Sequence, residues 1–114
     1  MAGDESAAWT VETLNETVDA EIEALPDDMY AHFIRLSGMI AARGLPEMRM
    51  PHVRHLEGPL WEMRLRGRDG ISRAIYVSAQ RRRVVVVRVF IKKTEETPRR
   101  EIRLALQRAR EVSQ

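Results

Sequence analysis

Residues 60–71 read LWEMRLRGRDGI, and this stretch determines the predicted fold. Apolar and charged side chains alternate from Trp61 to Arg66, which is typical of a β-strand with one buried face. Asp69 and Gly70 follow as a strong signal for a hairpin turn. The stretch therefore predicts one hairpin strand, a turn, and a second strand over residues 71–79.

A third strand is predicted over residues 82–92, because valine occupies all four positions from 84 to 87. A nearly unbroken β-branched run favours a central strand that is covered on both faces. The predicted sheet thus extends over residues 60–93. Residues 45–59 contain three prolines and are expected to form a loop.

The N-terminal part, residues 9–44, predicts a short strand and then an acidic helical hairpin. Apolar residues recur at helical spacing before Pro26, and again from Met29 to Ile40. Either Asn15 or Thr17 is expected to cap the first helix, and Gly44 is expected to end the second.

Thr97 and Pro98 predict the start of a last helix over residues 98–112. The predicted order β-α-α-β-β-β-α describes an α+β fold, with an antiparallel-rich sheet packed against the helical hairpin and the C-terminal helix. A chain of 114 residues has the size of a single domain, in which we expect residues 1–8 to be flexible.

The composition excludes several classes of protein. There is no cysteine, so disulfides, zinc–thiolate sites and cysteine nucleophiles are excluded. No apolar run approaches the ~18 residues that a membrane-spanning helix needs. The start MAGDESAAW has no apolar signal-peptide region, which predicts a cytoplasmic protein.

Charge is strongly polarised along the chain, although the net charge is only +2. The first 28 residues carry nine carboxylates and no lysine or arginine, whereas the remaining 86 carry 19 basic and 8 acidic side chains. Such a concentration of positive charge is typical of a surface that binds a polyanion, because neutralisation of phosphates supplies most non-specific affinity for nucleic acid.

Strand alternation predicts where the basic side chains meet. Arg64 and Arg66 share one face of the first hairpin strand, and Arg73 is the charged residue inside the second. Together with Lys92 or Lys93 they are expected to converge on one concave surface, where they could stabilise the charge of a phosphoryl transition state. The alternative is that these arginines only solvate the sheet and pair with carboxylates such as Glu62.

Four blocks of sequence and their spacing carry a family resemblance: His55-Leu-Glu-Gly-Pro-Leu-Trp-Glu-Met-Arg64, Asp69-Gly-Ile-Ser-Arg73, Val87-Arg-Val-Phe-Ile-Lys-Lys-Thr94, and Thr97-Pro98 before Glu101-Ile102. In these blocks the chain resembles the phage-derived, HigB-like branch of the RelE/ParE superfamily, over residues 9–112. The resemblance implies the toxin of a type II toxin–antitoxin system, an endoribonuclease that cleaves mRNA on the ribosome. It also implies a small antitoxin partner, commonly a helix-turn-helix protein, and a reaction without metal or other cofactor in which a ribose 2′-hydroxyl attacks the adjacent phosphate.

The charge pattern and the resemblance together suggest site residues. The catalytic candidates are Arg64, Arg66, Arg73, Lys93, His55 and Glu62, and the candidates for RNA contact are Arg54, Arg68, Arg82, Arg88, Lys92 and Arg99. Arginine stays protonated in proteins, so the arginines are expected to clamp phosphate and not to act as a base.

The identity of the general acid and base stays open, because this chain lacks residues that many relatives have. Many relatives have a lysine on the first hairpin strand and a tyrosine near the last helix, but here no tyrosine follows Tyr76. The candidate proton carriers are His55, Glu62, Lys93 and Tyr76, in falling order of preference; histidine ranks first because it titrates near neutral pH.

Two other functions compete with the nuclease. One is a non-catalytic module that binds nucleic acid through the same basic face, and the other is an inactive, prophage-derived remnant with the toxin fold. His52 and His55 invite a metal-site interpretation, but their spacing without further ligands is a weak signal, and no metal is expected.

Overall fold

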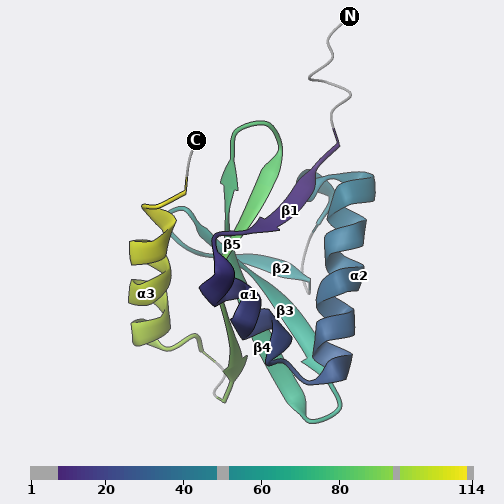
Figure 1. Ribbon diagram of the computed structural model, residues 1–114, viewed down its shortest axis with the longest axis vertical. Helices are drawn as coiled ribbons and strands as arrows, with labels where there is room; N and C mark the ends of the chain where they lie inside the picture. The colour runs from purple at the N-terminus through teal and green to yellow at the C-terminus, as the bar shows by residue number, and fades with distance from the viewer. Residues whose placement is uncertain (1–7, 49–51, 94–95, 113–114) are drawn as a thin grey trace, which may run out of the picture.

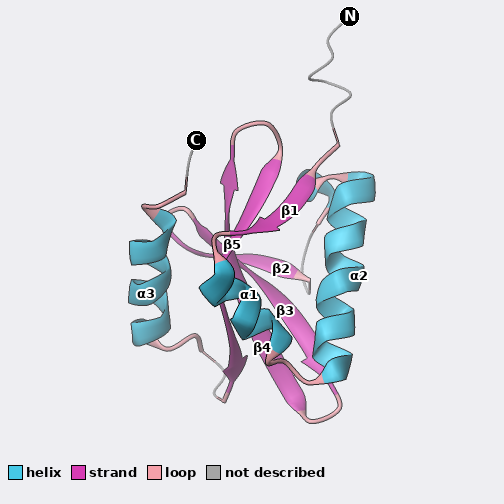
Figure 2. Ribbon diagram, viewed as in Figure 1, coloured by secondary structure: helices cyan, strands magenta, loops and turns pink. Residues whose placement is uncertain are grey.

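The computed structural model describes residues 8–48, 52–93 and 96–112, which form one α+β unit (Figures 1 and 2). Along the chain the elements are β1 (Thr10–Thr13), α1 (Glu16–Glu23), α2 (Asp27–Arg43), a 3-10 turn (Leu45–Glu47), β2 (Val53–Glu57), β3 (Leu60–Gly67), β4 (Gly70–Ala79), β5 (Arg83–Lys92) and α3 (Arg99–Ala109). This agrees with the predicted α+β fold and its order of helices.

The five strands form one sheet in the order β1-β5-β4-β3-β2. β1 runs parallel to β5, and every other neighbouring pair is antiparallel. The four valines from Val84 to Val87 are all buried, as expected for a strand that lies inside the sheet and is covered on both faces.

Helices cover the two faces of the sheet unequally. α1 and α2 pack on one face, where Val18, Leu36 and Ile40 join Met63 and Leu65 of β3 in a buried cluster. α3 packs on the other face, over β5 and the neighbouring part of β4 (Figure 1).

Local signals explain where the helices begin and end. The Asn15 side chain accepts a hydrogen bond from the Val18 N–H at 3.1 Å and caps α1, so Asn15 and not Thr17 is the cap. Gly44 ends α2 with φ +89°, a backbone conformation that glycine adopts without strain. Among the described residues, no helix has the length and apolar character needed to cross a membrane.

One expectation was wrong: residues 45–59 are not all loop. Val53–Glu57 forms β2, an edge strand that pairs antiparallel with β3. Only Val53 of this strand is fully buried, so the segment lacks the alternation that marks a half-buried strand. The segment becomes a strand because it pairs with the edge of β3, and this pairing cannot be recognised from the segment's own sequence. The third strand and the last helix also differ from expectation by one to three residues at their ends.

Candidate functional site

Arg64 of β3 and Arg73 of β4 lie directly opposite each other in the antiparallel register. Both side chains share the face of Glu62 and Ile75, which is the α3 side of the sheet. Directly opposed residues have Cβ atoms about 5 Å apart. The hairpin that the sequence predicts therefore brings two of the predicted guanidinium groups together.

Glu62 lies at the centre of this group and is 0% exposed. Its Oε2 accepts hydrogen bonds from Nη1 of Arg73 and from Nε of Arg54, the latter at 3.0 Å. Its Oε1 accepts a hydrogen bond from Oγ1 of Thr97 at 2.8 Å. Both oxygens of this buried carboxylate are thus engaged, by residues from β2, β4 and the start of α3.

We call Arg54, Arg64 and Arg73, with Glu62 between them, the arginine cluster. Burial lowers the pKa of Arg73, Glu62 acts in the opposite direction, and the nearby charges of Arg64 and Arg54 lower it further. Two guanidinium groups, those of Arg54 and Arg73, bind the Glu62 carboxylate, and Arg64 lies opposite Arg73, so the cluster keeps an excess of positive charge. An anion that approached this face would therefore be attracted.

Unused hydrogen-bond donors strengthen this conclusion. The Nε atoms of Arg64 and Arg73 are buried, and neither has a hydrogen-bond partner within the described part of the chain. Arg73 is only 2% exposed, so leaving a donor of this side chain unpaired costs stability. A buried donor without a partner in the protein calls for an explanation, and a ligand that supplies the acceptor is one.

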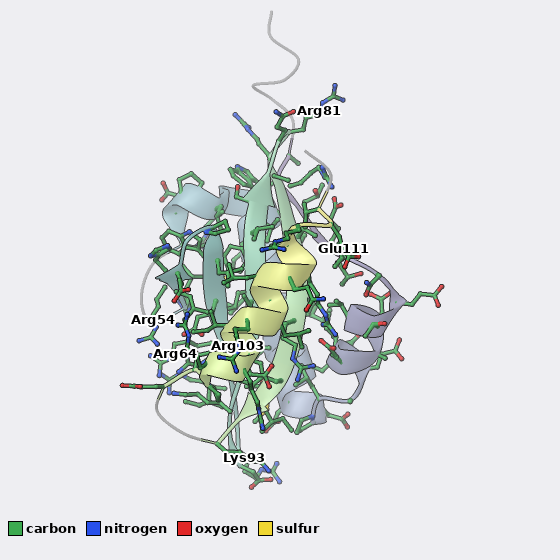
Figure 3. The ribbon with its side chains drawn as sticks, turned by 90° about the vertical axis from the view of Figure 1, so that its left-hand side faces the viewer. Arg54, Arg64, Arg81, Lys93, Arg103 and Glu111 are labelled. Atoms are coloured by element: carbon green, nitrogen blue, oxygen red, sulfur yellow. The ribbon has the colours of Figure 1, made fainter. Side chains whose placement is uncertain are left out.

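Other predicted cations lie farther along the same face. Arg66 of β3 pairs with Ile71 of β4, and Ile71 pairs with Lys92 of β5. These three residues lie on the same face as Arg64 and Arg73, two positions farther along the strands. Lys93 follows β5 and is exposed; Figure 3 shows it apart from Arg54 and Arg64, which lie together beside α3. The predicted convergence is thus tight at Arg64 and Arg73 and looser at Arg66, Lys92 and Lys93.

His55 does not join the arginine cluster. It pairs with Trp61, which in turn pairs with Tyr76, and Tyr76 faces α1 and α2. The His55 ring packs against Trp61 at 5.1 Å between ring centroids, and its Nε2 lies 2.8 Å from the Gly58 carbonyl oxygen. The sheet therefore separates His55 from Arg64 and Arg73.

The remaining candidate proton carriers are also poorly placed. Tyr76 lies on the same face as His55, and burial raises the pKa of its hydroxyl well above the usual range. Lys93 lies beyond the end of β5. Only Glu62 lies within the arginine cluster, and its oxygens already accept hydrogen bonds from three side chains.

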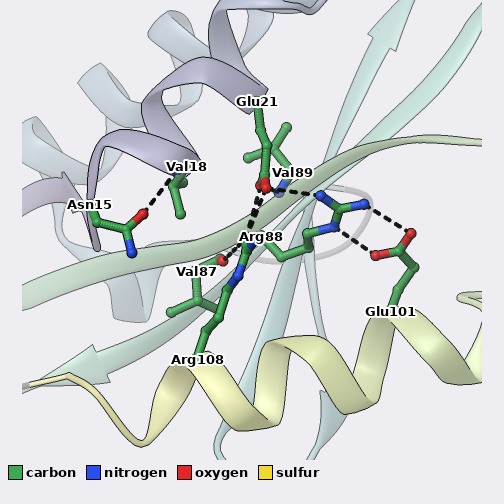
Figure 4. A network of polar contacts seen from close by, with 8 residues as sticks. All are labelled: Asn15, Val18, Glu21, Val87, Arg88, Val89, Glu101 and Arg108. Carbon is green, nitrogen blue, oxygen red and sulfur yellow. Dashed lines mark hydrogen bonds and ion pairs between the residues drawn. The ribbon is translucent and has the colours of Figure 1, made fainter.

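Arg88 was expected to contact RNA, but its guanidinium is held inside the protein. It binds Glu101 of α3 at 2.6 and 3.1 Å and Glu21 of α1 at 2.9 Å, and Arg108 of α3 binds the same Glu21 (Figure 4). These contacts join α1, β5 and α3. The structure therefore assigns Arg88 a role in holding the helices to the sheet.

The other predicted RNA contacts are dispersed. Arg99 forms an exposed ion pair with Glu57, at 2.7 and 2.9 Å. Arg68 lies on the turn between β3 and β4, where its backbone N–H donates to Asp28 at the start of α2. Arg82 lies on the β4–β5 turn, at the opposite end of the strands.

Thr97 is the site residue that sequence reasoning missed. The pair Thr97-Pro98 indicates only the start of a helix, and nothing near it in the sequence identifies Glu62 as its partner. Among the described residues, no group of three or more His, Asp and Glu side chains is placed to hold a metal ion.

Comparison with known proteins adds to this geometry. The family model "Phage derived protein Gp49-like (DUF891)" matches residues 20–110. A comparison with curated proteins found no match. A crystal structure of the archaeal RelE–RelB complex from Pyrococcus horikoshii OT3 is similar in fold: the TM-score is 0.57 and the identity 19%, over 74% of this chain and 94% of that one.

Proposed function

The chain belongs to the family of phage-derived, Gp49-like proteins, and on this premise we propose that it is the toxin of a toxin–antitoxin pair. In this proposal it is an endoribonuclease that cleaves mRNA on the ribosome and uses no metal. The RelE-like fold and the resemblance to HigB-like toxins in the sequence both support the proposal.

The observation that carries the proposal is the excess of guanidinium groups around Glu62. Arg54 and Arg64, which are partly exposed, and Arg73, which is buried, gather around Glu62, and two of them have an unpaired buried Nε. Guanidinium groups match the geometry of phosphate oxygens, so this cluster suits a phosphodiester.

The chemistry follows from what arginine can do. The RNA supplies its own nucleophile, the ribose 2′-hydroxyl, which loses its proton to water and forms a bond to phosphorus. The bond to the 5′-oxygen of the next nucleotide breaks, and this oxygen takes up a proton from water. Arg64 and Arg73 stabilise the additional negative charge on the pentacoordinate phosphate. Glu62 keeps Arg73 in place, and because both its oxygens are engaged we assign it to positioning and not to proton transfer.

A small antitoxin completes the proposal. The similar archaeal structure is a complex of RelE with RelB, and this supports the expectation that the present chain also binds a protein partner. A helix-turn-helix protein encoded in the neighbouring gene is the candidate.

One observation favours the non-catalytic alternative. Of the candidate proton carriers, Glu62 is fully engaged by hydrogen bonds and His55 faces the other way, so neither is free to carry a proton beside Arg64 and Arg73. A protein of this kind would bind RNA with a steep dependence on salt and leave it intact.

Induced expression in a bacterial host tests the proposal. We expect growth arrest with the wild-type chain, rescue by the neighbouring small gene product, and no arrest with Arg64→Ala. Arg35→Ala removes an exposed arginine from α2, on the opposite face, and is the matched control that should stay toxic. Equal toxicity of the two variants, with both folded, would show that the arginine cluster is not the site.

A further inference from the structure

β5 is paired on its outer side over only part of its length. On its inner side β4 pairs with it from Arg83 to Lys92, but β1 pairs only with Arg83–Val86. From residue 87 onward, therefore, no described strand pairs with the outer edge of β5. An open edge of this kind can pair with a strand from another polypeptide.

Two side chains occupy the first part of this edge. The N–H of Val89 donates to Oε1 of Glu21 at 3.0 Å, and the carbonyl of Val87 accepts from Nη1 of Arg108 at 2.9 Å. Val89 thus points its backbone N–H away from β4. In an antiparallel ladder the residue two positions on has the same orientation, so the N–H and C=O of Ile91 also point outward. Among the described residues, none forms a hydrogen bond with the outward groups of Ile91.

An apolar groove lies beside the same edge. Ala24 and Leu25, after α1, line it together with residues 88–91 of β5 and with Glu21, which is paired with Arg88 and Arg108, and its volume is about 290 Å³. Ile91 is 49% exposed, so its apolar side chain is accessible to a partner. In Figure 1 this end of β5 lies at the border of the sheet, between α1 and α3.

The charge at the end of β5 indicates the chemistry of the occupant. Lys92 and the exposed Lys93 follow directly after Ile91. They favour a segment that carries carboxylates, and they disfavour a second copy of this chain, whose own edge would bring the same lysines into the contact.

From these observations we infer that the outer edge of β5, around Val89 and Ile91, is a docking site for an extended, acidic segment of a partner protein. The segment adds a strand beside β5, places an apolar side chain in the groove and pairs a carboxylate with Lys93. This inference does not depend on the proposed nuclease, because the edge uses no residue of the arginine cluster.

Amide exchange measured by NMR tests the inference, with a short synthetic peptide in which glutamate alternates with valine as the probe. At saturating peptide we expect exchange of the Ile91 amide to slow by at least about tenfold, because that N–H becomes hydrogen-bonded. Ile91→Pro should weaken binding by at least about tenfold, since it removes a donor that the intramolecular ladder does not use. Ile91→Val keeps the donor and is the matched control that should bind like the wild type.

A second probe keeps the test independent of the folding of the proline variant. The same peptide with N-methyl groups on alternate residues cannot pair along one edge, and it should fail to bind the wild-type chain. Three results would overturn the inference: unchanged exchange at Ile91, equal binding of the methylated peptide, or peptide-induced shifts confined to the arginine cluster. A further result would be a dimer that the chain forms without peptide and that Ile91→Pro converts to monomers. That result would overturn the inference too, because the occupant would then be a second copy of the chain.

Discussion

Arg64 and Arg73 stand opposite each other on neighbouring strands, although both carry a positive charge. Like charges in directly opposed positions destabilise a sheet. Glu62 compensates for part of this repulsion, because its carboxylate binds Arg73 and Arg54 on the same face. This arrangement fits the proposal that the cluster binds an anion, which would remove the remaining repulsion.

The first prediction concerns the stability of Arg64→Ala. Removal of one of two opposed cations should leave the free energy of unfolding unchanged or raise it by up to ~1 kcal/mol. Urea denaturation of the purified variant measures this change. A clear loss of stability would mean that Arg64 holds the fold together, and the loss of toxicity in this variant would then have a structural cause.

The second prediction concerns Glu62. The variant Glu62→Gln leaves the buried guanidinium of Arg73 without a charged partner, and we expect a loss of about 3 kcal/mol in the free energy of unfolding. Glu57→Gln breaks the exposed pair with Arg99 and is the matched control, with a denaturation midpoint close to that of the wild type. Similar midpoints for the two variants would contradict the central place given to Glu62.

The third prediction concerns pH and His32 of α2. Burial lowers the pKa of His32, as do the charges of Arg35, His52 and Arg66, while its Nδ1 accepts a hydrogen bond from the Arg66 N–H at 2.7 Å. Because the folded pKa lies below the unfolded value, only the unfolded chain takes up this proton just below pH 6.5. Stability should therefore fall as the pH is lowered from 6.5 toward the folded pKa.

Thermal unfolding between pH 7.5 and 5 measures this effect, with His32→Asn as the comparison. The asparagine Oδ1 lies at the position of Nδ1 and can accept the same backbone hydrogen bond but does not titrate, so the decrease in Tm over this range should be smaller in the variant. An identical decrease in both proteins would place the titrating group elsewhere.

The fourth prediction concerns the β4–β5 turn. Arg81 and Arg82 have φ of +65° and +59°, in the left-handed region that asparagine and glycine adopt more readily. The double variant Arg81→Asn, Arg82→Gly should raise the free energy of unfolding by about 1 kcal/mol. The double variant Arg81→Gln, Arg82→Gln removes the same charges without relief of the backbone, and no such gain is expected from it. A gain in the glutamine variant alone would assign the effect to charge.

The sequence was sufficient for the hairpin that carries the arginine cluster. Alternation from Trp61 to Arg66 and the Asp69-Gly70 turn fix which side chains share a face, so the pairing of Arg64 with Arg73 could be anticipated. Side chains alternate between the two faces along a strand, and this alternation is a local property. It can therefore be predicted without knowledge of the rest of the fold.

Contacts between distant segments could not be predicted in this way. Arg88 appeared to be a surface cation because Glu21 and Glu101, which bind it, lie in helices far away in the sequence. His55 was expected in a loop with no fixed orientation, whereas β2 places it on the opposite face from Arg64. Thr97 contributes to the site only because the start of α3 folds back over Glu62.

Primer extension on translated mRNA, after induction of the chain, tests most directly the claim that the arginine cluster cleaves RNA. We predict new 5′ ends at defined positions within codons for the wild type and for Arg35→Ala, and none for Arg64→Ala. Cleavage by Arg64→Ala at the same positions and with the same intensity as the wild type would contradict the account.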